Sequence, residues 1–132
     1  MRRIIVVFFL AFFIFGCGPV KSFVHFRPTH DELLTNDFGP YPDNYQDIVK
    51  EIFENSLYDP YSAVFKFSKP LQVRRIVEPK YSWVVCGTVN AKNRLGGYVG
   101  AKLFAVTIHD GIAIEHKYDT SAELICNVFK PE

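Results

Sequence analysis

The stretch that decides the fold is Trp83-Val84-Val85-Cys86-Gly87-Thr88-Val89-Asn90-Ala91-Lys92-Asn93-Arg94-Leu95-Gly96-Gly97-Tyr98-Val99-Gly100-Ala101-Lys102-Leu103-Phe104. Its two ends are apolar, whereas its middle is polar and contains the paired glycines Gly96 and Gly97. β-branched and aromatic residues favour strands, and Asn and Gly favour turns. The stretch therefore predicts two strands joined by a polar loop.

The first of these strands, from Tyr81 to Val89, is predicted to lie inside a sheet. Trp83 and Val85 point to one face and Val84 to the other, so both faces carry apolar residues. Gly87 within the strand indicates a bulge or a close neighbour across the pleat.

Two more strands follow the loop, from Val99 to His109 and from Ile112 to Tyr118. The dipeptide Asp110-Gly111 lies between them. Asp-Gly between apolar runs is typical of a type I′ hairpin, in which both central residues take positive φ.

A helix is predicted before the sheet, from Asn44 to Leu57. Its apolar residues recur at helical spacing and form one stripe. Asp43 is placed to cap the helix, with Gln46 three residues later in a capping-box arrangement. Asp59-Pro60 prevents its continuation, since a residue before proline avoids helical geometry. The stripe consists of Tyr45, Ile48, Val49, Ile52, Phe53 and Leu57.

Three weaker elements complete the prediction. Ser62–Ser68 is predicted to be a strand, with Ala63, Phe65 and Phe67 on one face, and Leu71–Val77 is a further candidate strand. The adjacent Arg74 and Arg75 interrupt its alternation, so we expect one or both to be solvated, with contact to an anion or lipid headgroup as the alternative. Ser121–Phe129 is a short helix or strand, for which Thr120 or Ser121 is the candidate cap.

The fold class predicted from this order is α+β. An N-terminal amphipathic helix packs on a small antiparallel β-meander in two layers, and a C-terminal tail follows. Cys86 and Cys126 form an even pair once Cys17 is set apart, and we expect a disulfide that tethers the tail. Two buried free thiols are the alternative.

The N-terminus has the pattern of a secretory signal peptide. Arg2 and Arg3 precede an unbroken apolar run, Ile4–Phe15. Twelve residues span about 18 Å as a helix, which is short of a ~30 Å hydrocarbon core. A positive start, a short apolar body and a small residue at the end are typical of an exported chain.

Ile14-Phe15-Gly16-Cys17 resembles the lipobox of bacterial lipoproteins, although Phe15 is bulkier than usual. The resemblance implies that Cys17 is diacylated and becomes the first mature residue. Two or more acyl chains anchor a protein stably to a membrane. Gly18, in place of the Asp that retains such proteins in the inner membrane, favours the periplasmic face of the outer membrane. An ordinary secreted protein is the alternative.

The chain is thus divided into a lipoprotein signal peptide (1–16), a tether (17–41) and a single α+β domain (42–132). His25 and His30 in the tether, with Asp31 and Glu32, fit no zinc spacing, so we expect a solvated linker. Removal of residues 1–16 leaves 13 Lys and Arg against 14 Asp and Glu, a net charge of −1 instead of +1. This balance gives no electrostatic support for nucleic-acid binding, which normally needs a basic face.

The loop from Asn90 to Tyr98 has two interpretations. As a turn, it uses Asn and Gly for left-handed backbone angles, and Tyr98 pairs with Trp83 across the sheet. As a binding loop, it presents two amides and two cations to a carboxylate, a phosphate or a glycan. The turn is the favoured interpretation. The candidate binding residues are Asn90, Lys92, Asn93, Arg94, Gly97 and Tyr98.

Two motifs carry a further resemblance. Asp59-Pro60-Tyr61-Ser62-Ala63-Val64-Phe65, and then Cys86-Gly87-Thr88-Val89-Asn90-Ala91-Lys92-Asn93 with Gly96-Gly97-Tyr98-Val99-Gly100, resemble a family of small proteobacterial envelope lipoproteins. The resemblance covers Asp59 to Phe104 and implies an envelope location. It implies no activity.

No motif for a nucleophile, a phosphate loop or a metal protease is present. His109 and His116 flank the Asp110-Gly111 turn, and a metal site or a small hydrolase built on them is the least favoured hypothesis. We expect a non-catalytic periplasmic lipoprotein, without cofactor, that is anchored to the membrane and contacts another envelope component. The alternative is an accessory lipoprotein of a secretion, conjugation or phage-derived envelope machine.

Overall fold

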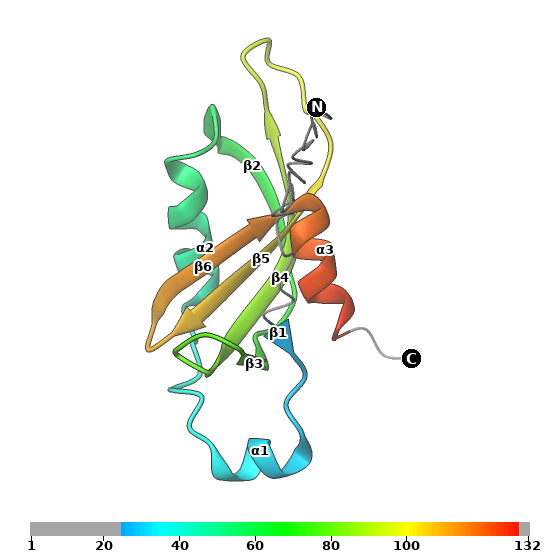
Figure 1. Ribbon diagram of the computed structural model, residues 1–132. Helices are drawn as coiled ribbons and strands as arrows, with labels where there is room; N and C mark the ends of the chain where they lie inside the picture. The colour runs from blue at the N-terminus through cyan, green and yellow to red at the C-terminus, as the bar shows by residue number, and fades with distance from the viewer. Residues whose placement is uncertain (1–24, 130–132) are drawn as a thin grey trace, which may run out of the picture.

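The computed structural model describes residues 25–129, and the signal peptide and Cys17 lie outside these described residues. The chain forms a six-stranded, antiparallel sheet with helices (Figure 1). This confirms the α+β class. The elements are β1 (His25–Phe26), α1 (His30–Thr35), α2 (Tyr45–Glu54), β2 (Asp59–Phe67), β3 (Leu71–Arg75), β4 (Tyr81–Lys92), β5 (Lys102–His109), β6 (Ile112–Tyr118) and α3 (Asp119–Asn127).

β4 is the central strand, as predicted. One of its edges pairs with β5 over Trp83–Val89. Its other edge is shared by two strands placed end to end: β3 pairs with residues 81–84, and β2 pairs with residues 87–92. β1 extends the sheet beyond β3, and β6 extends it beyond β5. The meander β3-β4-β5-β6 is therefore present, and β2 lies beside its longest strand.

α2 covers one face of the sheet with its apolar stripe. Ile48, Val49 and Phe53 are buried. They pack against Val85 and Phe104, which point to that face from β4 and β5. The predicted capping box is wrong, because the helix begins after Asn44 and no side chain caps it. The helix ends at Glu54, one turn before the predicted Leu57.

The opposite face of the sheet carries a second core, which corrects the two-layer prediction. Ala122 and Ile125 of α3 pack there against Val84, Ala105 and Val73. Figure 1 shows α2 and α3 on opposite sides of the strands. Alternation along β4 explains this, since Val84 and Val85 are both fully buried but point to opposite faces.

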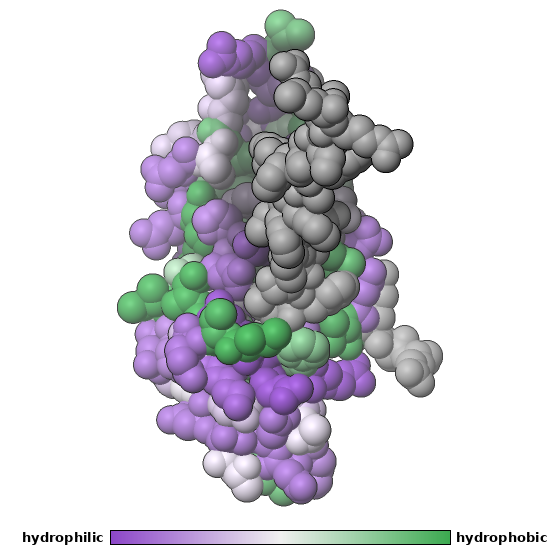
Figure 2. All heavy atoms as spheres, in the orientation of Figure 1, coloured by the Kyte–Doolittle hydropathy of each residue, from purple (hydrophilic) through white to green (hydrophobic). Residues whose placement is uncertain are grey.

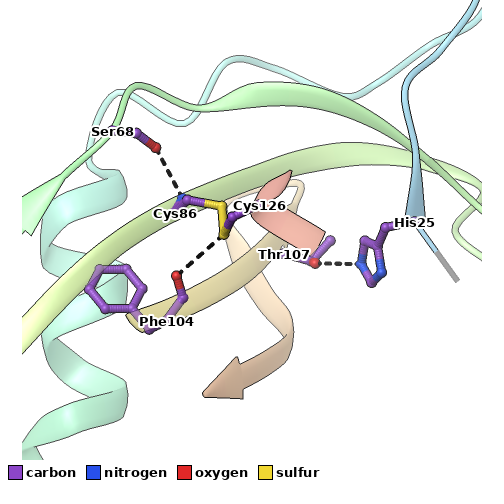
Figure 3. The surroundings of a disulfide bond; sticks show 6 residues. All are labelled: His25, Ser68, Cys86, Phe104, Thr107 and Cys126. Atoms are coloured by element: carbon purple, nitrogen blue, oxygen red, sulfur yellow. Dashed lines mark hydrogen bonds between the residues drawn. A yellow bond between two sulfur atoms is a disulfide. The ribbon is translucent and has the colours of Figure 1, made fainter. Parts of the chain in front are cut away.

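Cys86 and Cys126 form the predicted disulfide. The bond joins α3 to the middle of β4, and Figure 3 shows it between the two elements. The C-terminal helix is thus covalently attached to the strand that it covers.

Two local predictions are confirmed in detail. Asp110 (φ 48°) and Gly111 (φ 74°) both have positive φ, as a type I′ turn requires. A Cβ on Gly87 would lie 2.2 Å from the carbonyl oxygen of Lys66 and 2.5 Å from the ring of Phe104. Gly87 is therefore required by the close approach of β2 and Phe104.

The expected solvated tether is wrong from His25 onward. His25 and Phe26 form β1 and pair with Arg75 and Arg74 of β3. Phe38 is buried against the aromatic rings of Tyr81 and Trp83. Aromatic burial and strand pairing attach these residues to the sheet, so they belong to the domain.

Candidate functional site

The loop after β4 projects beyond the rest of the sheet (Figure 1). Lys92 and Tyr98 form an isolated antiparallel bridge at its base. Above the bridge, the Asn93 N–H donates to the Gly97 carbonyl (2.9 Å), and the Gly96 N–H donates to the Asn93 carbonyl (3.0 Å). These bonds define the conformation of the loop end.

The two asparagine side chains of the loop bind its own backbone. Asn93 Oδ1 accepts the N–H groups of Leu95 (2.9 Å) and Gly97 (3.1 Å), and Asn90 Oδ1 accepts that of Gly100 (3.1 Å). Gly100 has a φ of +99°, which favours glycine. Both side-chain oxygens are thus engaged in shaping the loop, as the turn interpretation expects.

The two cations of the loop lie over different tyrosines. Lys92 Nζ is 5.6 Å from the ring centre of Tyr98, and the Arg94 guanidinium carbon is 5.5 Å from that of Tyr58. Cation–π contacts of this kind are favourable at a protein surface. The cations therefore belong to two separate contacts and do not converge on one point.

The loop is also attached to the start of β2. The Tyr98 hydroxyl donates to the Ser62 carbonyl (3.1 Å), and the Lys92 N–H donates to Ser62 Oγ (2.9 Å). The predicted pairing of Tyr98 with Trp83 is wrong. Trp83 lies at the other end of β4, where its ring contacts Tyr41 and its indole N–H donates to the Gly39 carbonyl (3.1 Å).

Together, the loop and β2 expose a group of large apolar side chains, which we call the tip surface. Tyr61 is 100% exposed and Leu95 is 94% exposed. Apolar residues that gather on a surface mark interaction sites when they form a contiguous group. Residue pattern alone did not identify Tyr58 and Tyr61 as part of this surface, because only the fold brings them to the loop. The tip surface consists of Tyr58, Tyr61, Val64, Leu95, Tyr98 and Val99.

A second polar cluster lies on the sheet face that α3 covers, and the sequence did not reveal it. His25, only 2% exposed, places Nε2 3.0 Å from Thr107 Oγ1 and 3.2 Å from Glu115 Oε2. Arg75 Nη2 and Lys117 Nζ each lie 3.2 Å from the Glu115 carboxylate. Figure 3 shows the His25 ring directed at Thr107. The cluster joins β1, β3, β5 and β6.

Of the two arginines expected to include at least one solvated residue, Arg75 is buried and Arg74 is partly exposed. Arg74 lies over the Phe26 ring (5.3 Å) and 3.4 Å from Glu32. Each arginine therefore has a defined partner within the fold. Glu32 in turn caps the start of α1, where it accepts the Thr29 N–H.

Burial lowers the pKa of His25 from its ordinary value of 6.5, and the positive charges of Arg75 and Lys117 lower it as well. Glu115 opposes them and favours the protonated ring. Burial is the largest of these effects. The imidazole is thus held in its neutral form, as a buried structural group.

This cluster does not have the geometry of a catalytic triad. In a triad the hydroxyl and the carboxylate contact opposite nitrogens of the imidazole. Here Thr107 and Glu115 both lie at Nε2, and Nδ1 has no hydrogen-bond partner among residues 25–129. Thr107 is 1% exposed, so its hydroxyl is closed to a substrate.

The other histidines do not converge. In the β5–β6 hairpin His109 pairs with Ile112, whereas His116 pairs with Val106. His109 Nδ1 lies 3.4 Å from Ser82 Oγ. Within the described part of the chain, no group of three or more His, Cys, Asp or Glu side chains is placed to hold a metal ion.

A hollow of about 130 Å³ lies between α2 and β2. Phe53, Leu57, Ala63 and Phe65 form its apolar floor, and Lys50 and Glu54 stand at its rim. Ligand sites usually measure 300–1,000 Å³. The hollow is therefore too small to enclose a typical cofactor.

Among residues 25–129, no helix is both long and apolar enough to cross a membrane. No protein-family model, curated protein or solved structure matches the chain. The resemblance to small envelope lipoproteins stays a prediction.

Proposed function

We propose that this chain is a non-catalytic binding protein of the bacterial cell envelope, anchored to the membrane through a lipidated Cys17, and that its tip surface contacts another envelope protein. The proposal rests on the nearly complete exposure of Leu95, at the end of the hydrogen-bonded loop, and of Tyr61, in the adjoining strand β2. A partner that covers large exposed apolar side chains removes them from water, and this burial favours binding.

The composition of the tip surface supports a protein partner. Tyr and Arg are enriched among the residues that contribute most to protein–protein binding. The tip surface holds Tyr58, Tyr61 and Tyr98, with Arg94 and Lys92 stacked on two of these rings. The loop backbone is already fixed by Asn93, so binding costs little ordering entropy.

The disulfide supports the proposed location. Disulfides persist in oxidising compartments such as the periplasm and are rare in the cytosol. A chain that begins with a signal-peptide pattern and a lipobox-like Cys17 reaches that compartment, where Cys86 and Cys126 become oxidised. The proposal places the domain on the periplasmic face of the outer membrane.

The experiment is amine-reactive crosslinking in intact cells that express the full chain, with adducts identified by mass spectrometry. The yield of the adduct should fall at least about tenfold in the double variant Tyr61→Ser and Leu95→Ser, since a loss of 1.4 kcal/mol in binding free energy lowers the affinity by a factor of ten. The melting temperature of this variant should stay within about 2 °C of wild type, because fully exposed side chains contribute little to folding.

The matched control is Leu34→Ser. Leu34 is 73% exposed on α1, at the opposite end of the domain from Leu95. This variant should retain the adduct. If the tip variant retains the adduct as well, or if both variants lose it equally, the tip surface is not the binding surface.

A further inference from the structure

We infer that the turn between β3 and β4 rests on the lipid bilayer through Ile76 and Val77. The inference rests on the proposed anchor at Cys17 and adds a second, non-covalent contact with the same membrane. With this contact, one end of β4 lies at the bilayer and the other end carries the tip surface.

The chain between the proposed anchor and the sheet is short. Eight residue steps lead from Cys17 to His25. A fully extended chain advances at most about 3.5 Å per residue, so His25 lies within about 28 Å of an acylated Cys17. His25 is itself fixed, since it is 2% exposed and paired with Arg75. The β1 side of the domain is therefore kept next to the membrane.

The same side of the domain exposes large apolar side chains. β1 pairs with the last two residues of β3, and Ile76 and Val77 follow directly. These two side chains are 63% and 48% exposed. Ile112, 66% exposed, begins β6 at the same end of the sheet. Figure 2 shows hydrophobic residues below the middle of this face, over the β3–β4 turn and the β5–β6 hairpin.

Two hydrogen bonds close the turn that carries Ile76 and Val77. The Arg75 N–H donates to the Lys80 carbonyl (2.7 Å), and the Lys80 N–H donates to Glu78 Oε2 (2.9 Å). Ile76 and Val77 are exposed β-branched residues, and the exposed cation Lys80 follows them in the same turn. Apolar side chains beside a cation suit the boundary between acyl chains and anionic headgroups.

The two ends of β4 are far apart. β4 has 12 residues, so eleven steps of about 3.3 Å separate Tyr81 from Lys92 by roughly 36 Å. The turn of Ile76 and Val77 lies at the Tyr81 end, and the tip surface lies at the Lys92 end. Contact of the turn with lipid leaves the tip surface accessible to a partner.

The test uses the full lipidated chain in vesicles of phosphatidylethanolamine and phosphatidylglycerol, with and without bromine on the acyl chains. Bromine quenches tryptophan emission at short range. The variant is Val77→Trp and its matched control is Leu95→Trp. The chain has a single native tryptophan, Trp83, whose emission is subtracted as a constant background.

We expect the emission added by Val77→Trp to fall by at least half in brominated vesicles, and that added by Leu95→Trp to stay unchanged. Equal quenching of both variants, or of neither, in protein that floats with the vesicles overturns the inference and leaves the proposed tip contact intact. Protein that does not float with vesicles overturns both the anchor and the inference. Crosslinking from the tip surface reports on the partner separately.

Discussion

Reduction of the Cys86–Cys126 disulfide should lower the stability of this domain more than most single changes. The bond links residues 40 apart in sequence. Closing a loop of this length removes conformational entropy from the unfolded chain, worth about 4 kcal/mol at 25 °C on the chain-entropy relation. A domain of about 100 residues unfolds with an entropy near 0.2 kcal/mol/K, so the melting temperature should fall by roughly 15–20 °C.

The assay is thermal unfolding followed by circular dichroism, on oxidised wild type, on wild type with excess reductant, and on Cys86→Ala with Cys126→Ala. Reduction breaks the link and keeps both half-buried sulfur atoms beside the core, so it separates the effect of the crosslink from that of packing. We expect the reduced protein and the double variant to melt within a few degrees of each other. A fall of less than about 5 °C on reduction, with a large fall in the double variant, would refute the entropic reasoning and assign the stability to packing.

Three other changes test separate parts of the structure. Gly87→Ala should cost about 3 kcal/mol in urea unfolding, because its Cβ would overlap a backbone carbonyl. Gly97→Ala should cost under about 0.5 kcal/mol, because the nearest atom to its Cβ, the side-chain oxygen of Asn93, is 3.9 Å away, and equal losses would contradict the packing at Gly87. The pKa of His25 is lower in the folded protein than in the unfolded chain, so between these two values only the unfolded chain binds the proton. The free energy of unfolding should therefore be highest above pH 6.5 and should fall as the pH drops below it. His25→Gln should flatten that decline in denaturant titrations at pH 7.5 and 5.5, and an unchanged slope would show that another group titrates. Asn93→Ala should cost about 1 kcal/mol or less and speed amide exchange in the loop, and unaltered exchange would show that the side chain does not hold the loop.

The sequence alone predicted those features that depend on the special properties of one residue type. Asp110-Gly111 predicts its turn because both positions need positive φ. Gly87 marks a close contact because any Cβ there would overlap Lys66 and Phe104. The disulfide was predicted because Cys86 and Cys126 form an even pair once Cys17 is set apart, in a chain predicted to be exported. Each of these predictions depends on one position or one pair.

Contacts that join distant strands were not predictable in the same way. His25 lies in a segment whose prolines are typical of a linker, and nothing near it in sequence shows that it meets Thr107 and Glu115. That contact exists only because β1 pairs with β3 on one side and β5 with β6 on the other. Arg75 is buried for the same reason, since it shares a face with Glu115.

The candidate loop illustrates both cases. Its asparagines and glycines do shape the turn, as their residue types suggest. The exposed aromatic surface beside it needed the fold, because Ser62 and Lys92 bring the start of β2 against the loop. The proposed binding side chains are therefore Tyr61 and Leu95, and the amides of the loop have a structural role.

Photo-crosslinking in intact cells, with a photoreactive residue placed singly at Tyr61, Val77 or Glu51, tests the central claim most directly. Glu51 is an exposed residue of α2 and serves as the control position. We predict a discrete protein adduct from Tyr61, a lipid adduct from Val77 and neither from Glu51. A protein adduct from Val77 or Glu51, with none from Tyr61, would contradict the proposal that the tip surface binds a protein partner.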